Sequence, residues 1–164
     1  MKAVDVVMLT KNSELLLDKC LKSIYENVPV NRLIVVDAFS TDNTLKILDE
    51  FGKRYGNIKI ISDSGSRGRA REMGIREVET EWFMFVDSDV VLCEDWFRKV
   101  SRYVRQDVGA IWGLTFQDTY KTDLQRRFCN GWRLEYLISG EDATTYLYAM
   151  MQSKTLRFQA HCTL

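Results

Sequence analysis

The sequence predicts an α/β fold, a mostly parallel β-sheet flanked by helices, and three observations support this prediction. Four short apolar runs, at residues 4–9, 33–36, 58–61 and 82–86, are too short for typical helices and indicate buried strands. The segments between them carry apolar residues at helical spacing. Polar residues follow three of these strands directly. Alternating strands and helices imply βαβ units, whose right-handed crossovers bring the carboxyl ends of the strands to one edge of the sheet.

The first predicted helix follows the strand at residues 4–9. Asn12 and Ser13 offer side-chain oxygens that can cap its amino end. Pro29 ends the helical pattern, because proline cannot donate a helix hydrogen bond. Its apolar face consists of Leu17, Cys20, Leu21 and Ile24.

The second unit begins with the strand at residues 33–36, which ends at Asp37. Residues 40–42 can cap the helix that follows. Gly52 or Gly56 is expected to stop this helix, since glycine tolerates the left-handed conformation common at helix ends. We expect its inner face to carry Leu45, Leu48 and Phe51.

The rest of the chain continues the alternation. A Gly- and Arg-rich loop at residues 65–69 leads into a helix that carries Ala70, Met73 and Val78. After the strand at residues 82–86, which ends at Asp87, the pattern predicts a helix over 94–105, a strand over 108–115, helices over 123–138 and 142–151, and a strand over 155–161.

Composition and length favour one globular domain over residues 1–164, with an excised core of a longer protein as the alternative. Lys plus Arg equals Asp plus Glu at 23 each, which argues against nucleic acid as a partner. The four cysteines form no CxxC pair, so a structural zinc site is not expected. The sequence contains neither a signal peptide nor an apolar run of the roughly 18 to 20 residues that span a bilayer, and it favours a cytoplasmic location.

The strongest local signal for chemistry is the Asp-Ser-Asp segment at residues 87–89. Asp87 and Asp89 leave the end of a buried strand and can point toward one side. Carboxylate oxygens suit Mg²⁺ or Mn²⁺, and such an ion would also bind the oxygens of a diphosphate. A solvated turn is the alternative.

Two further segments offer binding groups at the same sheet edge. Asp37 can accept hydrogen bonds from a ribose or a base, or it can serve a helix-capping loop, and the sequence leaves both open. Arg67, Arg69 and Arg71 surround a loop before a helix, an arrangement that favours phosphate; a solvated basic surface is the alternative.

Later in the chain, Glu141 and Asp142 begin a predicted helix, where acidic residues also simply favour the helix dipole. His161 is the only histidine and ends a predicted strand, so it is either a structural residue or a metal ligand. Basic and aromatic residues between 126 and 136 suit either a membrane surface or an ordinary charged helix.

Several of these segments together resemble the family 2 glycosyltransferases of the GT-A fold. Residues 9–12 resemble the family's first-strand ending, with Lys11 in place of the usual aromatic residue, and residues 35–44 its Val-Asp-Asp-Gly-Ser-Thr-Asp-Gly-Thr segment. Residues 70–74 are similar to its Ala-Arg-Asn-x-Gly helix. Residues 87–89 match its Asp-x-Asp metal motif, and residues 140–142 resemble its later Glu-Asp element. The joint occurrence of these elements in order is far more specific than any one of them.

The resemblance implies an inverting, metal-dependent transfer of a sugar from a nucleotide diphosphate sugar to an acceptor hydroxyl. It implies that Asp142 is the general base and that Asp89, with Asp87, holds Mg²⁺ or Mn²⁺, His161 being a possible extra ligand. The donor-binding residues that it implies are Thr10, Asn12, Asp37, Arg71 and Asp87.

The acceptor is left open between a sugar and a lipid-linked or protein-linked group, and peripheral contact at the inner membrane face is one option. A sugar-phosphate nucleotidyltransferase-like enzyme and a non-catalytic nucleotide-binding domain of the same fold are the rival interpretations.

Overall fold

The computed structural model describes residues 3–111 and 159–160. In this part of the chain, five parallel strands form one sheet in the order β3-β2-β1-β4-β5. The strands are β1 (Val4–Thr10), β2 (Val30–Asp37), β3 (Ile58–Ser62), β4 (Phe83–Val86) and β5 (Gln159–Ala160). The chain therefore builds β2 and β3 on one side of β1 and then crosses back to place β4 on the other side.

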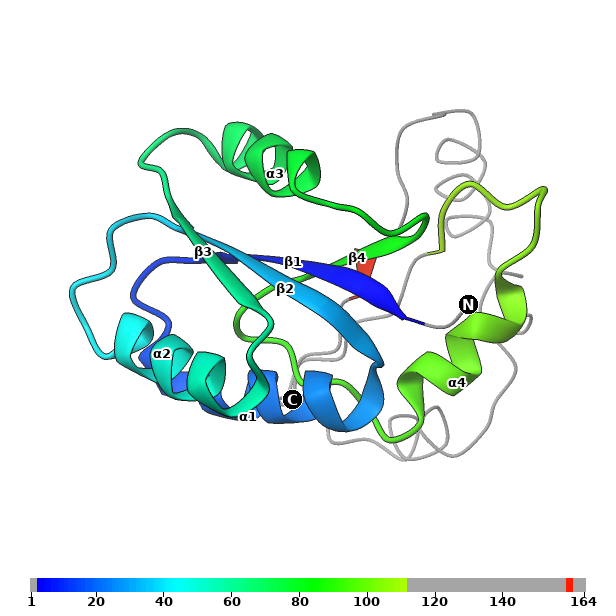
Figure 1. Cartoon of the computed structure of the whole chain (residues 1–164), viewed down its shortest axis with the longest axis horizontal. Helices are drawn as coiled ribbons and strands as arrows, with labels where there is room; N and C mark the ends of the chain where they lie inside the picture. Colours follow the sequence, from blue (N-terminus) through cyan, green and yellow to red (C-terminus); the bar gives the residue numbers. More distant parts are fainter. Residues whose placement is uncertain (1–2, 112–158, 161–164) are drawn as a thin grey trace, which may run out of the picture.

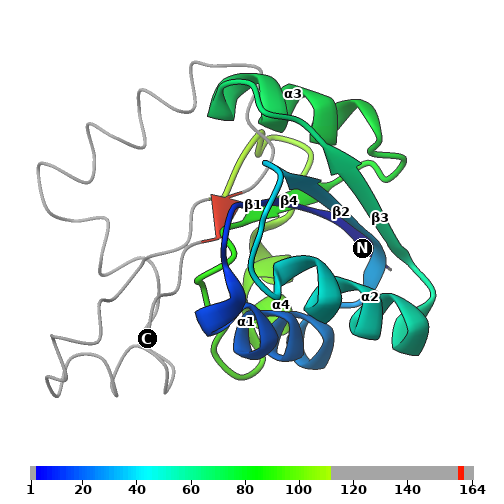
Figure 2. The ribbon, with the colours of Figure 1, turned by 90° about the vertical axis from the view of Figure 1, so that its left-hand side faces the viewer.

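Helices cover both faces of the sheet (Figures 1 and 2). On one face lie α1 (Glu14–Asn27), α2 (Thr44–Tyr55) and α4 (Trp96–Val100), the last followed by the 3₁₀ turn η1 (Ser101–Tyr103). On the opposite face lies α3 (Arg67–Arg76). Within the described residues, no helix is both long and apolar enough to cross a membrane.

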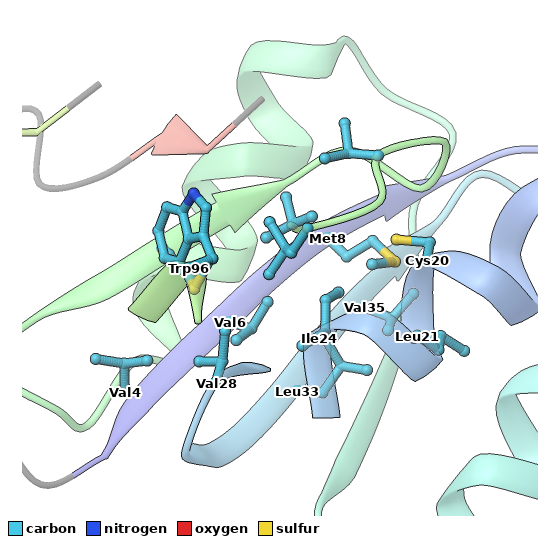
Figure 3. Close-up of a cluster of buried hydrophobic side chains, with 14 of the residues drawn as sticks. Val4, Val6, Met8, Cys20, Leu21, Ile24, Val28, Leu33, Val35 and Trp96 are labelled. Atoms are coloured by element: carbon cyan, nitrogen blue, oxygen red, sulfur yellow. The ribbon is translucent and has the colours of Figure 1, made fainter. Parts of the chain in front are cut away.

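The alternation of side chains along β1 divides the core between the two faces. Val4, Val6 and Met8 belong to the larger apolar cluster, together with residues of α1 and with Trp96 of α4 (Figure 3). Leu48 and Phe51 of α2 belong to the same cluster. Val7 points the other way and packs with Ile34, Phe83 and Phe85. Central strands of a parallel sheet are buried on both faces, which is why these runs are almost continuously apolar.

Helix α3 approaches the sheet closely at Gly74. A Cβ atom at this position would lie 2.4 Å from Cγ1 of Val7 and 3.6 Å from Cγ2 of Val36. The absence of a side chain therefore lets the helix rest directly on β1 and β2.

A buried carboxylate organises the amino end of the sheet. Asp5 accepts hydrogen bonds from the backbone N–H groups of Glu79 (2.7 Å) and Thr80 (3.1 Å) and from Nδ2 of Asn31 (2.8 Å). Burial raises the pKa of Asp5, but these hydrogen bonds outweigh it and leave the pKa below its ordinary value. The network fixes the turn that precedes β4 to β1 and β2.

The predicted order of strands and helices is confirmed from β1 to β4. Gly56 ends α2 with a left-handed φ of 71°, and α1 ends at Asn27, before Pro29. Of the strand expected over 155–161, Gln159–Ala160 is observed as β5, and the remaining residues lie outside the described ranges. The helices expected over 123–138 and 142–151 also lie outside them.

Two predictions about α2 and α3 are wrong in detail. Leu45 was expected on the inner face of α2 but is 41% exposed. Thr44, Leu48 and Phe51 occupy that face, and Leu45 is rotated from Thr44 by about 100° around the helix. Arg67 to Arg69 belong to the first turn of α3 rather than to a loop, because the Ser66 hydroxyl accepts the Arg69 N–H and caps the helix.

Two further predictions fail after β4. The helix expected over 94–105 is confined to Trp96–Val100 and the 3₁₀ turn, since Asp95 has a left-handed φ of 61°. The strand expected over 108–115 is absent from its described part: the Val108 N–H donates to the Arg105 carbonyl, which makes a turn. Ile111 is buried there as part of a packed loop.

Candidate functional site

The carboxyl ends of β1, β2 and β4 lie at the same edge of the sheet, because all three strands are parallel. Thr10 stands opposite Asp37 in the β1–β2 register, and Val7 stands opposite Phe85 in the β1–β4 register. Asp37 and Asp87 therefore lie at one edge, as predicted. The strand order reverses at β1, with β2 and β3 on one side of it and β4 on the other. Ligands of open α/β sheets bind at such switch points, outside the carboxyl ends of the strands.

Asp37 is the centre of a buried hydrogen-bond cluster at this edge. Its Oδ1 accepts from the Thr10 hydroxyl (2.8 Å) and the Ser40 hydroxyl (2.6 Å), and its Oδ2 accepts from the Ser40 N–H (2.8 Å). Asp37 is only 1% exposed and Thr10 is also buried. The geometry thus favours the loop-ordering role that the sequence left open for Asp37.

Asn12 joins the loop after β1 to the loop after β2. Its N–H donates to the Ser40 hydroxyl (2.9 Å), and its side-chain Oδ1 accepts from the Thr41 N–H (2.9 Å). Asn12 adopts a left-handed φ of 49°, which asparagine tolerates better than most residues. A rigid pair of loops results, and it carries Phe39 at its exposed rim.

The Asp-Ser-Asp segment is tied to the start of α1. The hydroxyl groups of Ser88 and Ser13 are 2.8 Å apart, and the Ser13 N–H donates to the Thr44 hydroxyl at 2.7 Å. Asp87 is half-buried and Asp89 is exposed. The three loops that follow β1, β2 and β4 are therefore directly connected.

A buried thiol lies beneath these carboxylates. Cys20 Sγ donates to the Asp87 carbonyl oxygen at 3.5 Å. Burial raises the pKa of the Cys20 thiol to about 12, and the negative charges of Asp89 and Asp87 add to the shift. The thiol is thus protonated at neutral pH in the chain without a bound metal.

The residues at the end of β4 fit a divalent ion that shares its coordination with a ligand. Within residues 3–111, no three His, Cys, Asp or Glu side chains gather into a metal site. Asp87 and Asp89 nevertheless offer hard oxygen donors on one short exposed segment. Mg²⁺ is typically held by one or two carboxylates together with substrate phosphates and water, so this donor set suits it.

Basic residues of α3 lie on the other face of the sheet. The guanidinium carbon of Arg71 lies 6.0 Å from the centre of the Phe85 ring, and Phe85 comes two residues before Asp87 on β4. Arg69 is engaged elsewhere, since its Nε lies 3.2 Å from Oδ1 of the buried Asp63. Arg71 is thus placed beside the end of β4, whereas Arg69 is not.

Asp142, Glu141 and His161 lie outside the described residues, as does the basic and aromatic segment at 126–136. Their roles stay predictions. Ala160 of β5 directly precedes His161 in the sequence and is described. It pairs with Val86, the residue before Asp87.

Two features of the edge were not expected from the sequence. The Ser13–Ser88 contact joins residues 75 positions apart, and single serines carry no signal for such a pairing. Phe39 has a left-handed φ of 54° and is 61% exposed. The sequence carries one signal for the unusual backbone of Phe39: a bulky residue stands between Asp37 and Ser40, in a turn that favours glycine.

Part of the chain is similar in sequence to known bacterial proteins. The chain is 36% identical over 92 residues to a poly(ribitol-phosphate) beta-glucosyltransferase of Bacillus spizizenii, a match that covers 52% of this chain and 14% of that protein. It is 34% identical over 93 residues to a teichoic acid poly(glycerol phosphate) polymerase of Staphylococcus epidermidis, covering 54% and 13%. The chain therefore spans only a small part of the curated relatives that it matches.

Solved structures share the fold. The structure of S. aureus TarS 1-349 in complex with UDP has a TM-score of 0.59 at 22% identity, over 71% of this chain and 37% of that one. A Mycobacterium tuberculosis glucosyl-3-phosphoglycerate synthase in complex with Mn²⁺, UDP and phosphoglyceric acid has a TM-score of 0.59 at 18% identity, over 98% and 68%. The predicted GT-A fold is thus confirmed. Because the sequence profile of Glycosyl transferase family 2 matches residues 5–161, the chain belongs to that family.

Proposed function

We propose that this chain is the catalytic core of an enzyme that transfers a sugar from a nucleoside diphosphate sugar to an acceptor hydroxyl, with a divalent metal and with inversion at the anomeric carbon. The observation that carries the proposal is the placement of Asp87 and Asp89 at the topological switch point. There they lie beside the cluster of Thr10, Asn12 and Asp37 after the neighbouring strands.

Each part of the edge has a role in this proposal. Asp37 fixes Thr10 and Ser40, and the loops that they order form the nucleoside side of the site. Thr10, Asn12 and Asp37 bind or position the nucleoside, and Arg71 contributes positive charge beside β4. Asp89 and Asp87 hold Mg²⁺ or Mn²⁺.

A bound divalent ion supplies positive charge that offsets the negative charge developing on the departing diphosphate. Asp89 is proposed as the direct ligand, and Asp87 binds either directly or through water or the ribose. His161 is proposed as a further ligand. The pairing of Ala160 with Val86 supports it, because it brings the chain just before His161 beside the chain just before Asp87.

The reaction needs one displacement. A bond forms between the acceptor oxygen and the anomeric carbon, while the bond from that carbon to the diphosphate breaks and its electron pair leaves with the nucleoside diphosphate. Asp142 is proposed to take the acceptor's proton as general base. A single displacement inverts the anomeric centre.

Binding of UDP with and without Mn²⁺ tests the metal site. UDP is the first nucleotide to try, since it is bound in the structures of TarS and of the mycobacterial synthase named above. A ligand that binds only the folded chain raises its melting temperature, and calorimetry gives the Kd. We expect Mn²⁺ to tighten UDP binding and Asp89→Asn to weaken that effect at least about 10-fold.

The matched control is Asp49→Asn, the same chemical change at an exposed carboxylate of α2. This variant should bind UDP and Mn²⁺ as the wild type does. If Asp89→Asn keeps the full effect of Mn²⁺, the proposed metal ligand is wrong.

Sugar transfer tests the proposed base. Asp142→Asn should fold and bind donor normally but lose transfer by about 10² to 10⁴, the contribution of a general base. Glu141→Gln should be milder. The acceptor panel should include a poly(ribitol phosphate), the polymer for which one relative is named, together with sugar and lipid-linked acceptors.

Three results would change this assignment. A dead Glu141→Gln beside an active Asp142→Asn would move the base to Glu141. Full activity of both variants would place it elsewhere. Donor binding without transfer or hydrolysis in the wild type would favour a nucleotide-binding domain.

A further inference from the structure

Phe39 is the unusual residue of the binding edge because its backbone is strained. Its φ of 54° lies in the left-handed region, which bulky side chains rarely adopt. In the described part of the chain, the other non-glycine residues with positive φ are Asn12 and Asp95, both of types that tolerate this conformation.

Burial does not offset this strain. The side chain of Phe39 is 61% exposed, whereas Phe51, Phe83 and Phe85 are almost completely buried. An exposed aromatic ring at a strained position gains little for the fold. Strained residues that persist are held by their surroundings and cluster at ligand-binding sites.

The hydrogen bonds around Phe39 hold it in place. The Ala38 N–H donates to the Thr10 carbonyl at 2.9 Å, and the Ser40 N–H donates to Asp37 Oδ2 at 2.8 Å. The Ser40 hydroxyl also accepts from the Asn12 N–H. Both neighbours of Phe39 are therefore fixed to the end of β1 or β2, and the ring has a rigid base at the rim of the site.

We propose that the ring of Phe39 is the surface on which the base of the donor nucleotide stacks. This inference rests on the proposed function, which brings a nucleoside to the loops after β1 and β2. A nucleobase has a flat π-face that matches an aromatic ring, and one such stack changes affinity by about 5- to 150-fold. The ring thus positions the donor, while the carboxylates at the end of β4 lie on the diphosphate side.

Ligands with and without a base separate this role from a structural one. Kd values are measured by calorimetry in Mn²⁺ for UDP and for pyrophosphate, which has no base. Phe39→Leu keeps an apolar side chain but removes the ring, and Phe39→Trp keeps an aromatic surface. Leu45→Ala is the control, since it removes an exposed apolar side chain at the start of α2.

We expect Phe39→Leu to bind UDP about 5- to 150-fold more weakly and pyrophosphate as before, with Phe39→Trp and Leu45→Ala close to the wild type. The melting temperature of Phe39→Gly should equal or exceed that of the wild type, because glycine adopts a positive φ without strain. Its UDP binding should nevertheless be weak.

Unchanged UDP binding by Phe39→Leu would overturn the inference and leave the proposed function standing. A lower melting temperature for Phe39→Gly, with both ligands weakened equally, would overturn it in favour of a structural role. A wild type that binds neither ligand would overturn the proposed function and this inference with it.

Discussion

Replacing Gly74 by alanine tests how tightly α3 is packed on the sheet. The new Cβ would lie 2.4 Å from Cγ1 of Val7, more than 1 Å inside ordinary van der Waals contact. Val7 is completely buried in β1, between β2 and β4, so it has little room to move. Either α3 shifts away from the sheet or Val7 leaves its preferred rotamer.

The expected free-energy change follows from two opposing effects. Overpacking a core costs about 1–3 kcal/mol, and alanine favours the helix over glycine by about 1 kcal/mol. Gly74→Ala should therefore lower the free energy of unfolding by up to about 2 kcal/mol. Gly68→Ala is the control on the same helix, because its Cβ would meet only the Ser66 hydroxyl, at 3.9 Å. That variant should be neutral or slightly more stable.

A double-mutant cycle with Val7→Ala identifies the contact. Val7→Ala alone should cost about 2 kcal/mol, since it removes buried methyl groups. In that background the clash is gone, and Gly74→Ala should become neutral or stabilising. Urea unfolding of the four proteins gives the coupling energy. If the free-energy changes of the two substitutions add within about 0.5 kcal/mol, the contact with Val7 is not the reason that glycine is required at position 74.

Two further predictions concern buried groups. Asp5→Ala should lower the free energy of unfolding by about 3 kcal/mol or more, because it leaves the N–H groups of Glu79 and Thr80 without their acceptor. Since the pKa of Asp5 is lowered by folding, its contribution should be complete above about pH 5 and lost as the pH falls below about 4. Urea unfolding should therefore show a weaker acid dependence of stability in the variant than in the wild type, the remainder coming from groups such as Asp42 and Asp95. A wild type and variant with the same acid dependence would refute this. Cys20 should react with iodoacetamide at pH 7.5 about 10³-fold more slowly than an unfolded peptide, because its pKa is raised to about 12; rapid labelling of the native chain, measured by peptide mapping, would show that the thiol is accessible.

The fold was predictable where apolar runs and turn signals coincide. The buried runs around Val6 and Ile34 are continuous because central parallel strands are covered on both faces. Pro29 marked the end of α1 correctly, and of the two glycines expected to stop α2, Gly56 does so while Gly52 lies inside the helix. The strand order was not predictable, since it depends on packing such as the contact between Gly74 and Val7.

Prediction failed where a single backbone angle or a rotation of one residue decides the outcome. The left-handed φ of Asp95 prevents the helix from starting at Glu94, and composition does not reveal it. Leu45 lies one position from the buried face of α2, and periodicity over such a short helix did not exclude it.

The candidate site was predicted as a set of residue types, but not as a network. Asp37, Asp87 and Asp89 were chosen because they follow strands, and the parallel sheet does bring them to one edge. That Asp37 is buried and satisfied by Thr10 and Ser40 depends on loop geometry. The sequence identified Asp37 as a candidate, but it could not show whether its carboxylate contacts a ligand or stabilises the loop.

The strand order also determines when the two halves of the edge can form as the chain folds. The bond between Thr10 and Asp37 spans 27 residues and needs only β1 and β2, whereas the bond between Ser13 and Ser88 spans 75. Closing a longer loop costs more entropy and is slower. The half of the edge proposed to hold the nucleoside therefore needs only β1 and β2, whereas the two carboxylates join it only after the chain has returned across the sheet. Within residues 3–111, the half that carries Asp87 and Asp89 is thus the later of the two to be assembled.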